Sequence, residues 1–563
     1  MSARAKSKAA VAKRDKPPKA RRVKEDRPRR PALFSRRSPA PPPTYDGALL
    51  AGYRRPPLSN GKRTLLYLLL AAICIGWGVM FGLAAPFKIM PLLAPLPLLA
   101  LLLVWVLPQG EYAPTGALEP LFLAFFAALF VWPNYIAITI PHLPWLTMLR
   151  IFAAPLIFVL LICISVSPNF RKAIGDPMRS DPYIWKLVVA FVVIQTVSLL
   201  FTNRLNISLN KYIVAQMNHT AIFFVSCYLF TRPGLATRWA GAYLAMAYVI
   251  CFVGIWQMLI GKVPWVGHIP PLLKVDSALI DNVLDGIERS AIGKQRVQSL
   301  LTSPLGLAEV LGLAAPFAIH FAVAQGSRLF TRIVSVLYLP LALYVILLSD
   351  SRLGIVVLMG AALFYVLIWA SLRWRSDQRS LIAPAMVLAY PAVLMGTFVA
   401  SFFVGFLRRA VWGSGAEASS TTARLTQWEM AKPHLFSHPW GFGIGEAART
   451  VGFRSPNGQM TLDSYYIQLL MDYGFLGFIV YMAIFIRASW VAGSSVVKYK
   501  PTGDLTILLP IAVALMNFVV AKMVFILDSN HPLIFMMLGG ALALSWRLKN
   551  KAEAEARGAP VGA

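Results

Sequence analysis

The chain has 563 residues, of which 57% are hydrophobic and only 14% are charged. Soluble domains carry about a quarter charged residues, so this composition excludes a soluble enzyme. The formal net charge is +30, from 54 lysines and arginines against 24 aspartates and glutamates. Half of this excess lies in residues 1–63, which hold 19 basic residues against four acidic ones.

Residues 1–63 are rich in Lys, Arg and Pro and show almost no apolar periodicity. Such a segment cannot bury enough surface to fold alone, so we expect a disordered, basic, Pro-rich cytoplasmic tail. Basic tails bind either anionic lipid or nucleic acid. The apolar spans that follow favour a topology anchor at the membrane. Residues 548–563 are expected to form a second cytoplasmic tail.

Apolar windows long enough to cross a bilayer follow one another between these tails. They predict an all-α, polytopic integral membrane protein whose transmembrane domain covers residues 64–547, with about 14 helices in a range of roughly 12 to 14. The windows are 64–85, 91–107, 119–139, 145–166, 184–202, 212–230, 239–261, 303–325, 331–348, 354–372, 381–407, 464–486, 504–526 and 531–547.

The short loops predict the orientation, because Lys and Arg are retained on the cytoplasmic side. Basic residues recur on the side shared with the amino-terminal tail, as in Arg171, Lys172 and Arg179, Arg373 and Arg375, or Lys549 and Lys551. We therefore expect both termini in the cytoplasm. Two long loops, 262–302 and 408–463, then lie outside, where substrate-handling groups are expected.

Charged residues gather at the external helix ends and in these loops. They are Arg296, Glu309, Arg352, Arg424 and Asp463. Guanidinium groups grip phosphate through paired hydrogen bonds and keep their charge when partly desolvated. The arginines thus indicate a site for a polyanion at the outer surface. The alternative is that each arginine reaches lipid headgroups on its own.

Two histidines and a glycine-rich segment could in principle bind a metal or a phosphate. His434 and His438 lack the helical setting of a zinc peptidase motif, because Pro433 and Pro439 interrupt the segment. The glycine-rich segment 441–445 (GFGIG) has neither the lysine nor the preceding strand of a phosphate-binding loop. We expect a flexible turn there, and neither a metal nor a cofactor in the protein.

Four motifs in order resemble the O-antigen ligase/polymerase family of bacterial inner-membrane glycosyltransferases. They are R-x-Q-x-x-x-x-S-P-L-G-L-A at 296–308, SR-x-G at 351–354, R-x-x-x-W followed by HPWGFGIG, and a polar pair before YYIQLLMDYGFLG. The motif-bearing part covers roughly residues 290–490. The resemblance implies a large periplasmic loop, here 408–463, that closes over a membrane cavity, and undecaprenyl-pyrophosphate-linked sugars as substrates.

The resemblance also implies roles for single residues. Arg296 and Arg352 would hold the pyrophosphate, and Arg424 would be a third contact or a loop anchor. An external carboxylate must take the proton of the acceptor, and we expect Asp463 to do so, with Glu429 as a second candidate. Asp463 could instead order the loop by pairing with Arg424 or Arg454.

One departure from the family pattern bears on the acceptor. Ligases typically show a histidine in the polar pair, where this chain has Asp463 and Ser464. This favours a polymerase of O-antigen or exopolysaccharide repeats over an O-antigen ligase that transfers glycan to lipid A core. A flippase or other transporter is the third hypothesis. Few mid-membrane ionisable residues support it, among them Glu309, Asp472 and Lys522.

The expected setting follows from the polymerase hypothesis. The protein would be a multi-pass protein of the inner membrane and would contact membrane lipid and the undecaprenyl-pyrophosphate-linked oligosaccharide. A flippase and a chain-length regulator are possible partners, and nucleic acid is not.

Overall fold

A computed structural model describes residues 61, 64, 65, 68, 72 and 95–557, apart from 140–144, 276, 290–293, 325, 327, 378, 380, 406, 409–417, 456, 457, 459, 525 and 527. The expected basic tail, most of the window 64–85 and the end of the carboxy-terminal tail lie outside the described residues.

Helices dominate the amino-terminal half of the described chain. They are α3 (Pro95–Val106), α4 (Leu118–Val131), α5 (Met148–Val166), α6 (Pro168–Ser180), α7 (Pro182–Ser198), α8 (Leu205–Ala215), α9 (Ile222–Leu229) and α10 (Leu235–Ile260). A π-helical turn, Gln216–Ala221, joins α8 to α9. Short strands β1 (Ala137–Ile138) and β2 (Leu146–Thr147) pair antiparallel between α4 and α5.

The carboxy-terminal half holds two kinds of helix, long ones and short ones in the loops. They are α11 (Ala278–Asp285), α12 (Pro304–Val323), α13 (Leu329–Leu348), α14 (Arg352–Ser376), α15 (Ile382–Phe403), α17 (Ala418–Ser437), α18 (Ala447–Val451), α19 (Tyr465–Tyr499), α20 (Leu508–Lys522) and α21 (His531–Ala556). Strands β3 (Ile287–Arg289) and β4 (Lys294–Arg296) form an antiparallel hairpin before α12.

The all-α membrane fold predicted from composition is confirmed. Nine of the described helices are long and apolar enough to cross a membrane, or ten if α6 and α7, which meet at 107°, form one broken span. The expected number of about fourteen spans is not confirmed.

The difference from fourteen has a physical cause in the described region. The window 119–139 holds only α4, which ends at Val131 because Trp132 is extended and Pro133 follows. The window 212–230 is divided between α8, the π-helical turn and α9. Hydropathy counts apolar residues and does not register where the backbone leaves the helix.

The long helices differ in how deeply they are buried. The apolar window of α21 is 89% buried and that of α12 is 83% buried, whereas the window of α15 is 11% buried. The central helices therefore pack on protein and the peripheral one presents side chains for lipid. Gly354 lets α14 approach closely, since a Cβ there would lie 2.6 Å from Ile346 and 2.9 Å from Ala308.

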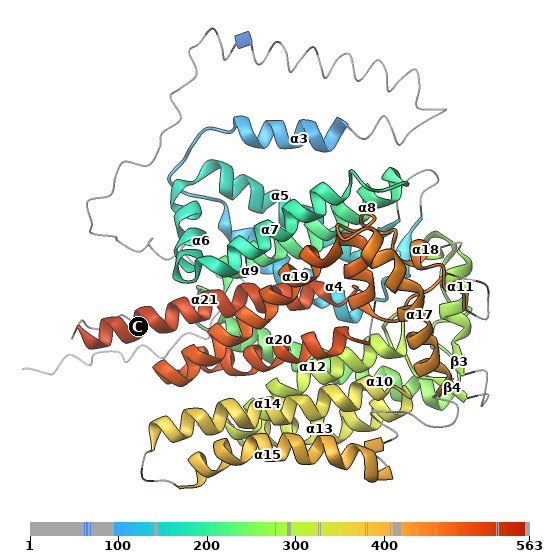
Figure 1. The fold of residues 1–563 in the computed structure, drawn as a ribbon. Helices are drawn as coiled ribbons and strands as arrows, with labels where there is room; N and C mark the ends of the chain where they lie inside the picture. The colour runs from blue at the N-terminus through green and yellow to red at the C-terminus, as the bar shows by residue number, and fades with distance from the viewer. Residues whose placement is uncertain are drawn as a thin grey trace, which may run out of the picture. The chain divides into compact units, whose positions relative to one another are not determined.

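Figure 1 shows α12, α14, α19, α20 and α21 running side by side, with α11, the β3–β4 hairpin, α17 and α18 gathered at one end of them. The elements between α10 and α12, and those between α15 and α19, come from the two segments expected to be long external loops. The second group contacts the amino-terminal ends of α14 and α19, through Thr421 and Gln427 of α17. We call this end of the bundle the loop end.

Candidate functional site

Arg296 is the last residue of β4 and fastens the turn that leads into α14. Its Nε donates to the carbonyl oxygen of Ser349 at 3.0 Å, and its Nη2 donates to that of Asp350 at 3.1 Å. Asp350 has a left-handed backbone with φ of 49°, a conformation that side chains other than glycine seldom adopt. Arg296 therefore stabilises the turn immediately before Arg352.

Arg352 begins α14 and reaches the helix that covers it. Its Nη2 lies 3.5 Å from Oγ1 of Thr421 on α17, at the far limit of a hydrogen bond. Since Arg296 holds the preceding turn, β4, α14 and α17 meet at this point of the loop end. The structure thus brings two of the predicted arginines together.

Arg424 lies on the face of α17 that is turned toward the bundle, and its side chain is half-buried. Its Nε is buried and has no hydrogen-bond partner among the described residues. Burial lowers the pKa of Arg424, the carboxylate of Asp463 raises it, and the positive charge of Arg352 lowers it. A guanidinium stays protonated in spite of such a shift, so two like charges are held close together. This arrangement favours an anionic ligand.

Asp463 immediately precedes Ser464, the N-cap residue of α19. Its backbone N–H donates to Oε1 of Gln427, a fully buried side chain on α17, at 2.9 Å. Its carboxylate makes no hydrogen bond or ion pair with any residue in the described part of the chain. Arg454, one of the two alternative partners, donates to the carbonyl oxygen of Gly458 instead. The Asp463 carboxylate is therefore placed beside Arg424 without being engaged by it.

Glu429, the second candidate for a base, lies elsewhere on α17. Its side chain is 68% exposed and pairs with Lys432 at 2.7 Å. It lies five positions after Arg424, which places it roughly 140° away around the helix. The structure does not bring Glu429 together with the arginines.

The glycine-rich segment 441–445 packs closely, in contrast to the flexible turn expected from the sequence. The N–H groups of Phe442 and Gly443 donate to the carbonyl oxygens of Met471 and Asp472 at 2.7 and 3.1 Å. Gly441 has φ of 87°, and a Cβ there would lie 2.7 Å from the backbone nitrogen of Gly474. The segment interlocks with α19 where that helix leaves regular geometry, at Gly474.

Two buried carboxylates fix the segment that follows. Oδ1 of Asp472 accepts from the N–H of Ala447 at 2.9 Å, and Glu446 pairs with Arg204, with Oε1 3.1 Å from Nε. Burial alone would raise the pKa of Glu446, but the hydrogen bond and charge of Arg204 outweigh this and lower it. These contacts tie the loop between α17 and α19 to α19 and to the segment before α8.

A second charged cluster joins α12 to α20, and the sequence did not predict that its two charges pair. Glu309 on α12 and Lys522 on α20 are both fully buried, with Nζ 3.1 Å from Oε1. Nδ2 of Asn530 donates to Oε2 of Glu309 at 2.7 Å. Nearby, the hydroxyl of Ser464 donates to the carbonyl oxygen of Met523 at 2.8 Å. The sequence does contain a signal for this pair. Glu309 and Lys522 carry opposite charges, each lies in an apolar window, and each is near the external end of its helix.

Metal ligands do not gather in the part of the chain that the structure describes, where no group of three His, Cys, Asp or Glu residues could hold an ion. His434 and His438 both lie against the ring of Phe442, with centroid distances of 5.9 and 4.5 Å. Their contacts are those of packed aromatic side chains.

Fold and site together define a multi-pass membrane protein with an electropositive site at one end of its helix bundle. The family model described as O-antigen ligase matches residues 337–482. This stretch runs from α13 into α19 and includes Arg352, Arg424 and Asp463, while Arg296 precedes it. No curated protein matches the chain. The match supports the resemblance of the motifs to the O-antigen ligase/polymerase family.

Proposed function

We propose that this protein polymerises undecaprenyl-pyrophosphate-linked oligosaccharide repeats of O-antigen or exopolysaccharide at the periplasmic face of the inner membrane. The observation that carries the proposal is the pair of like charges on Arg352 and Arg424: Arg352 contacts Thr421, one turn before Arg424 on α17. The carboxylate of Asp463 acts on Arg424 electrostatically and makes no hydrogen bond or ion pair with the described residues. Two guanidinium groups supply the fork geometry that a pyrophosphate needs. The neighbouring carboxylate supplies a base.

The reaction follows from these positions. A hydroxyl of the acceptor repeat attacks the anomeric carbon of the donor glycan, and its proton passes to Asp463. The bond between that carbon and the pyrophosphate oxygen breaks, and undecaprenyl pyrophosphate leaves with the electron pair. Arg352 and Arg424 stabilise the negative charge that develops on the leaving group, which is where fixed positive groups accelerate a reaction most.

Arg296 has a different part in this proposal from that of Arg352. Two of its five N–H donors are committed to the carbonyl oxygens of Ser349 and Asp350. It holds the turn that presents Arg352, and its positive charge adds to the attraction for the pyrophosphate. Arg424, on the covering helix α17, binds the pyrophosphate from the other side.

A polymerase is preferred to a ligase because Asp463 and Ser464 stand where ligases typically carry a histidine. The transporter hypothesis needs ionisable groups that can relay protons or ions at membrane depth. Here Glu309 and Lys522 pair with each other, and Asp472 accepts from a backbone N–H. These contacts serve the packing of helices.

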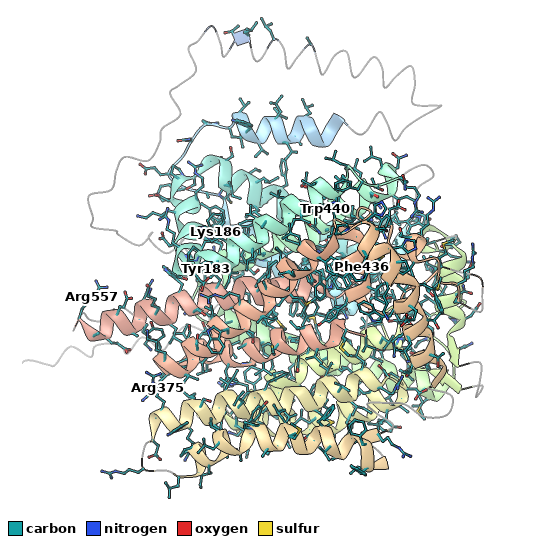
Figure 2. All side chains as sticks on the ribbon, in the orientation of Figure 1. Tyr183, Lys186, Arg375, Phe436, Trp440 and Arg557 are labelled. Carbon is teal, nitrogen blue, oxygen red and sulfur yellow. The ribbon has the colours of Figure 1, made fainter. Side chains whose placement is uncertain are left out.

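The orientation proposed for this function places the loop end in the periplasm and both termini in the cytoplasm. Figure 2 shows Arg375 and Arg557 at the left edge of the view, away from Phe436 and Trp440. This distribution fits retention of basic residues in the cytoplasm. A reporter active only in the periplasm, fused at position 415 or 376, is expected to be active at 415 and silent at 376. The reverse pattern would contradict the orientation.

The acceptor is tested with the purified full-length protein in lipid. It is given the lipid-linked repeat as donor, and either the same lipid-linked repeat or lipid A core as acceptor. A polymerase forms a ladder of longer lipid-linked glycans without lipid A core. Product that appears only when lipid A core is present would identify a ligase. A flippase or chain-length regulator from the same cell is added in a later step, to learn whether it alters chain length.

A further inference from the structure

A pocket of about 270 Å³ lies far from the loop end, where α21, the later turns of α19 and the junction of α6 with α7 meet. Its polar lining includes Asp181, Arg487, Lys498, Tyr499, Ser545 and Lys549. Arg487 also lies over the ring of Tyr183, 5.4 Å from its centroid, and Figure 2 labels Tyr183 on this side of the molecule. None of these residues takes part in the reaction proposed above.

The pocket carries an excess of positive charge. Arg487 pairs with Asp181 at 2.7 Å, which leaves Lys498 and Lys549 as two further cations in the lining. Lys549 is half-exposed and lies 4.0 Å from Glu553, at the outer limit of an ion pair. Such an exposed contact contributes little to stability. Nζ of Lys498 lies 5.0 Å from the centroid of the Tyr499 ring, so a weak contact holds each lysine and an anion in the pocket could draw both.

Two polar atoms of the lining have no partner among the described residues. Oγ of Ser545 is buried, in a residue that is only 5% exposed, and Nε of Arg487 is buried as well. A buried polar atom without a hydrogen bond is costly, and an occupant that accepts hydrogen bonds would remove the cost. The lining thus offers donors as well as charge.

The polar pocket continues into an apolar groove on α19. Arg487 and Trp490 line both, and the rest of the groove consists of Phe478, Ile479, Met482, Ala483 and Ile486. Trp490 is 70% exposed and Ile479 is 61% exposed, so this face of α19 is open to lipid. The Trp490 ring stands at the boundary between the two, as tryptophans do at the membrane interface.

We propose that the pocket binds the phosphate headgroup of an anionic phospholipid whose acyl chains lie in the groove along α19. Basic pockets between membrane helices on the cytoplasmic side are suited to anionic headgroups. Free phosphate satisfies the charge but leaves the apolar groove unused, whereas a phospholipid matches both halves of the site. The inference concerns the opposite end of the bundle from the arginine site and does not depend on the proposed reaction.

The experiment measures lipid binding to the purified full-length protein in detergent by native mass spectrometry and by the shift in melting temperature. The probes are phosphatidylglycerol, phosphatidylcholine and glycerol phosphate, which has the phosphate without acyl chains. The test variant is K498Q/K549Q, and the matched control is R375Q/R557Q, which removes two exposed cations outside the pocket lining.

Phosphatidylglycerol should bind the wild type and the control equally, and the test variant about 25-fold more weakly, because each cation near a headgroup contributes about fivefold in affinity. Phosphatidylcholine should bind weakly to all three. The proposal is overturned if both variants lose affinity alike, or if phosphatidylcholine binds the wild type as well as phosphatidylglycerol does. Protection by glycerol phosphate equal to that by phosphatidylglycerol would likewise exclude a lipid as the occupant.

Discussion

Two groups of charged side chains lie near each other at the loop end, and they differ in whether their charges are neutralised within the group. Glu309 and Lys522 are fully buried and neutralise each other at 3.1 Å, with Asn530 as a further partner. Arg352 and Arg424 instead place like charges close together, and Nε of Arg424 has no partner among the described residues. The first group is paired within the fold, with Oε1 of Glu309 facing Lys522 but accepting no hydrogen bond among the described residues. The second carries like charges that fit the anionic substrate proposed above, so we expect stability experiments to detect the first group and activity experiments the second.

The largest effect on stability is expected from breaking the buried pair. Lys522→Met leaves Glu309 charged and unpaired, which should lower the free energy of unfolding by about 3–5 kcal/mol. The double variant Glu309→Gln/Lys522→Met removes both charges and should recover most of the loss. The melting temperature in detergent and the membrane protein level report this, with the exposed Lys432→Met as control. A double variant as unstable as the single one would show that the pair is not the source of the effect.

A large loss of turnover is expected when the proposed base cannot accept a proton. Asp463→Asn keeps the size of the side chain and should lower turnover by about 100-fold or more, while binding of the lipid-linked donor is retained. Glu429→Gln, on the exposed face of α17, should leave turnover unchanged. Polymer formation from purified lipid-linked repeats measures both. Wild-type turnover in Asp463→Asn, or an equal loss in Glu429→Gln, would remove Asp463 from this role.

A smaller effect concerns the loop that covers the site. Because the pKa of Glu446 is lowered in the folded chain, its pair with Arg204 contributes fully above the ordinary carboxyl pKa. The contribution is lost as the pH falls through the lowered value. Proteolysis of the segment 441–452 should therefore speed up in acid in the wild type. In Glu446→Gln it should be faster at neutral pH and less dependent on pH. Identical pH profiles would contradict this assignment.

The smallest effect is expected from the amino-terminal tail. Deleting residues 1–55 should leave glycan length and yield nearly unchanged, since a segment that the sequence predicts to stay unfolded in the cytoplasm would not reach the proposed periplasmic site. Glycan profiles in a deletion strain, at matched membrane protein levels, check this. Loss of polymer at a normal protein level would give the tail a role beyond anchoring.

The sequence predicts that the protein spans a membrane and that the arginines lie near one another. Both predictions have a physical basis. Apolar composition is a direct requirement of the bilayer, and charged residues at helix ends on one side must meet at that end. Arg352, Arg424 and Asp463 lie together at this end, whereas Glu429 does not, because it lies roughly 140° around α17 from Arg424. Among the described residues, the Asp463 carboxylate forms no ion pair with Arg424 or Arg454, although its charge acts on Arg424.

What the sequence does not reveal depends on contacts between distant segments. The interlock of Gly441 with Gly474 requires knowledge that the segment lies against a break in α19. The pairing of Glu309 with Lys522 requires the packing of α12 on α20. Gln427, which positions the backbone of Asp463, has no sequence signal of its own. Hydropathy likewise counted apolar windows that the backbone divides or ends early.

The central claim is that the arginines hold a pyrophosphate through paired hydrogen bonds, and substitution by lysine tests it most directly. Arg352→Lys and Arg424→Lys keep the charge but lose the fork geometry. The account predicts that each lowers polymer formation nearly as much as the alanine variant, by about 100-fold or more, at an unchanged membrane protein level. Simple contact with lipid headgroups predicts that lysine substitutes freely. Full activity in both lysine variants would contradict the account.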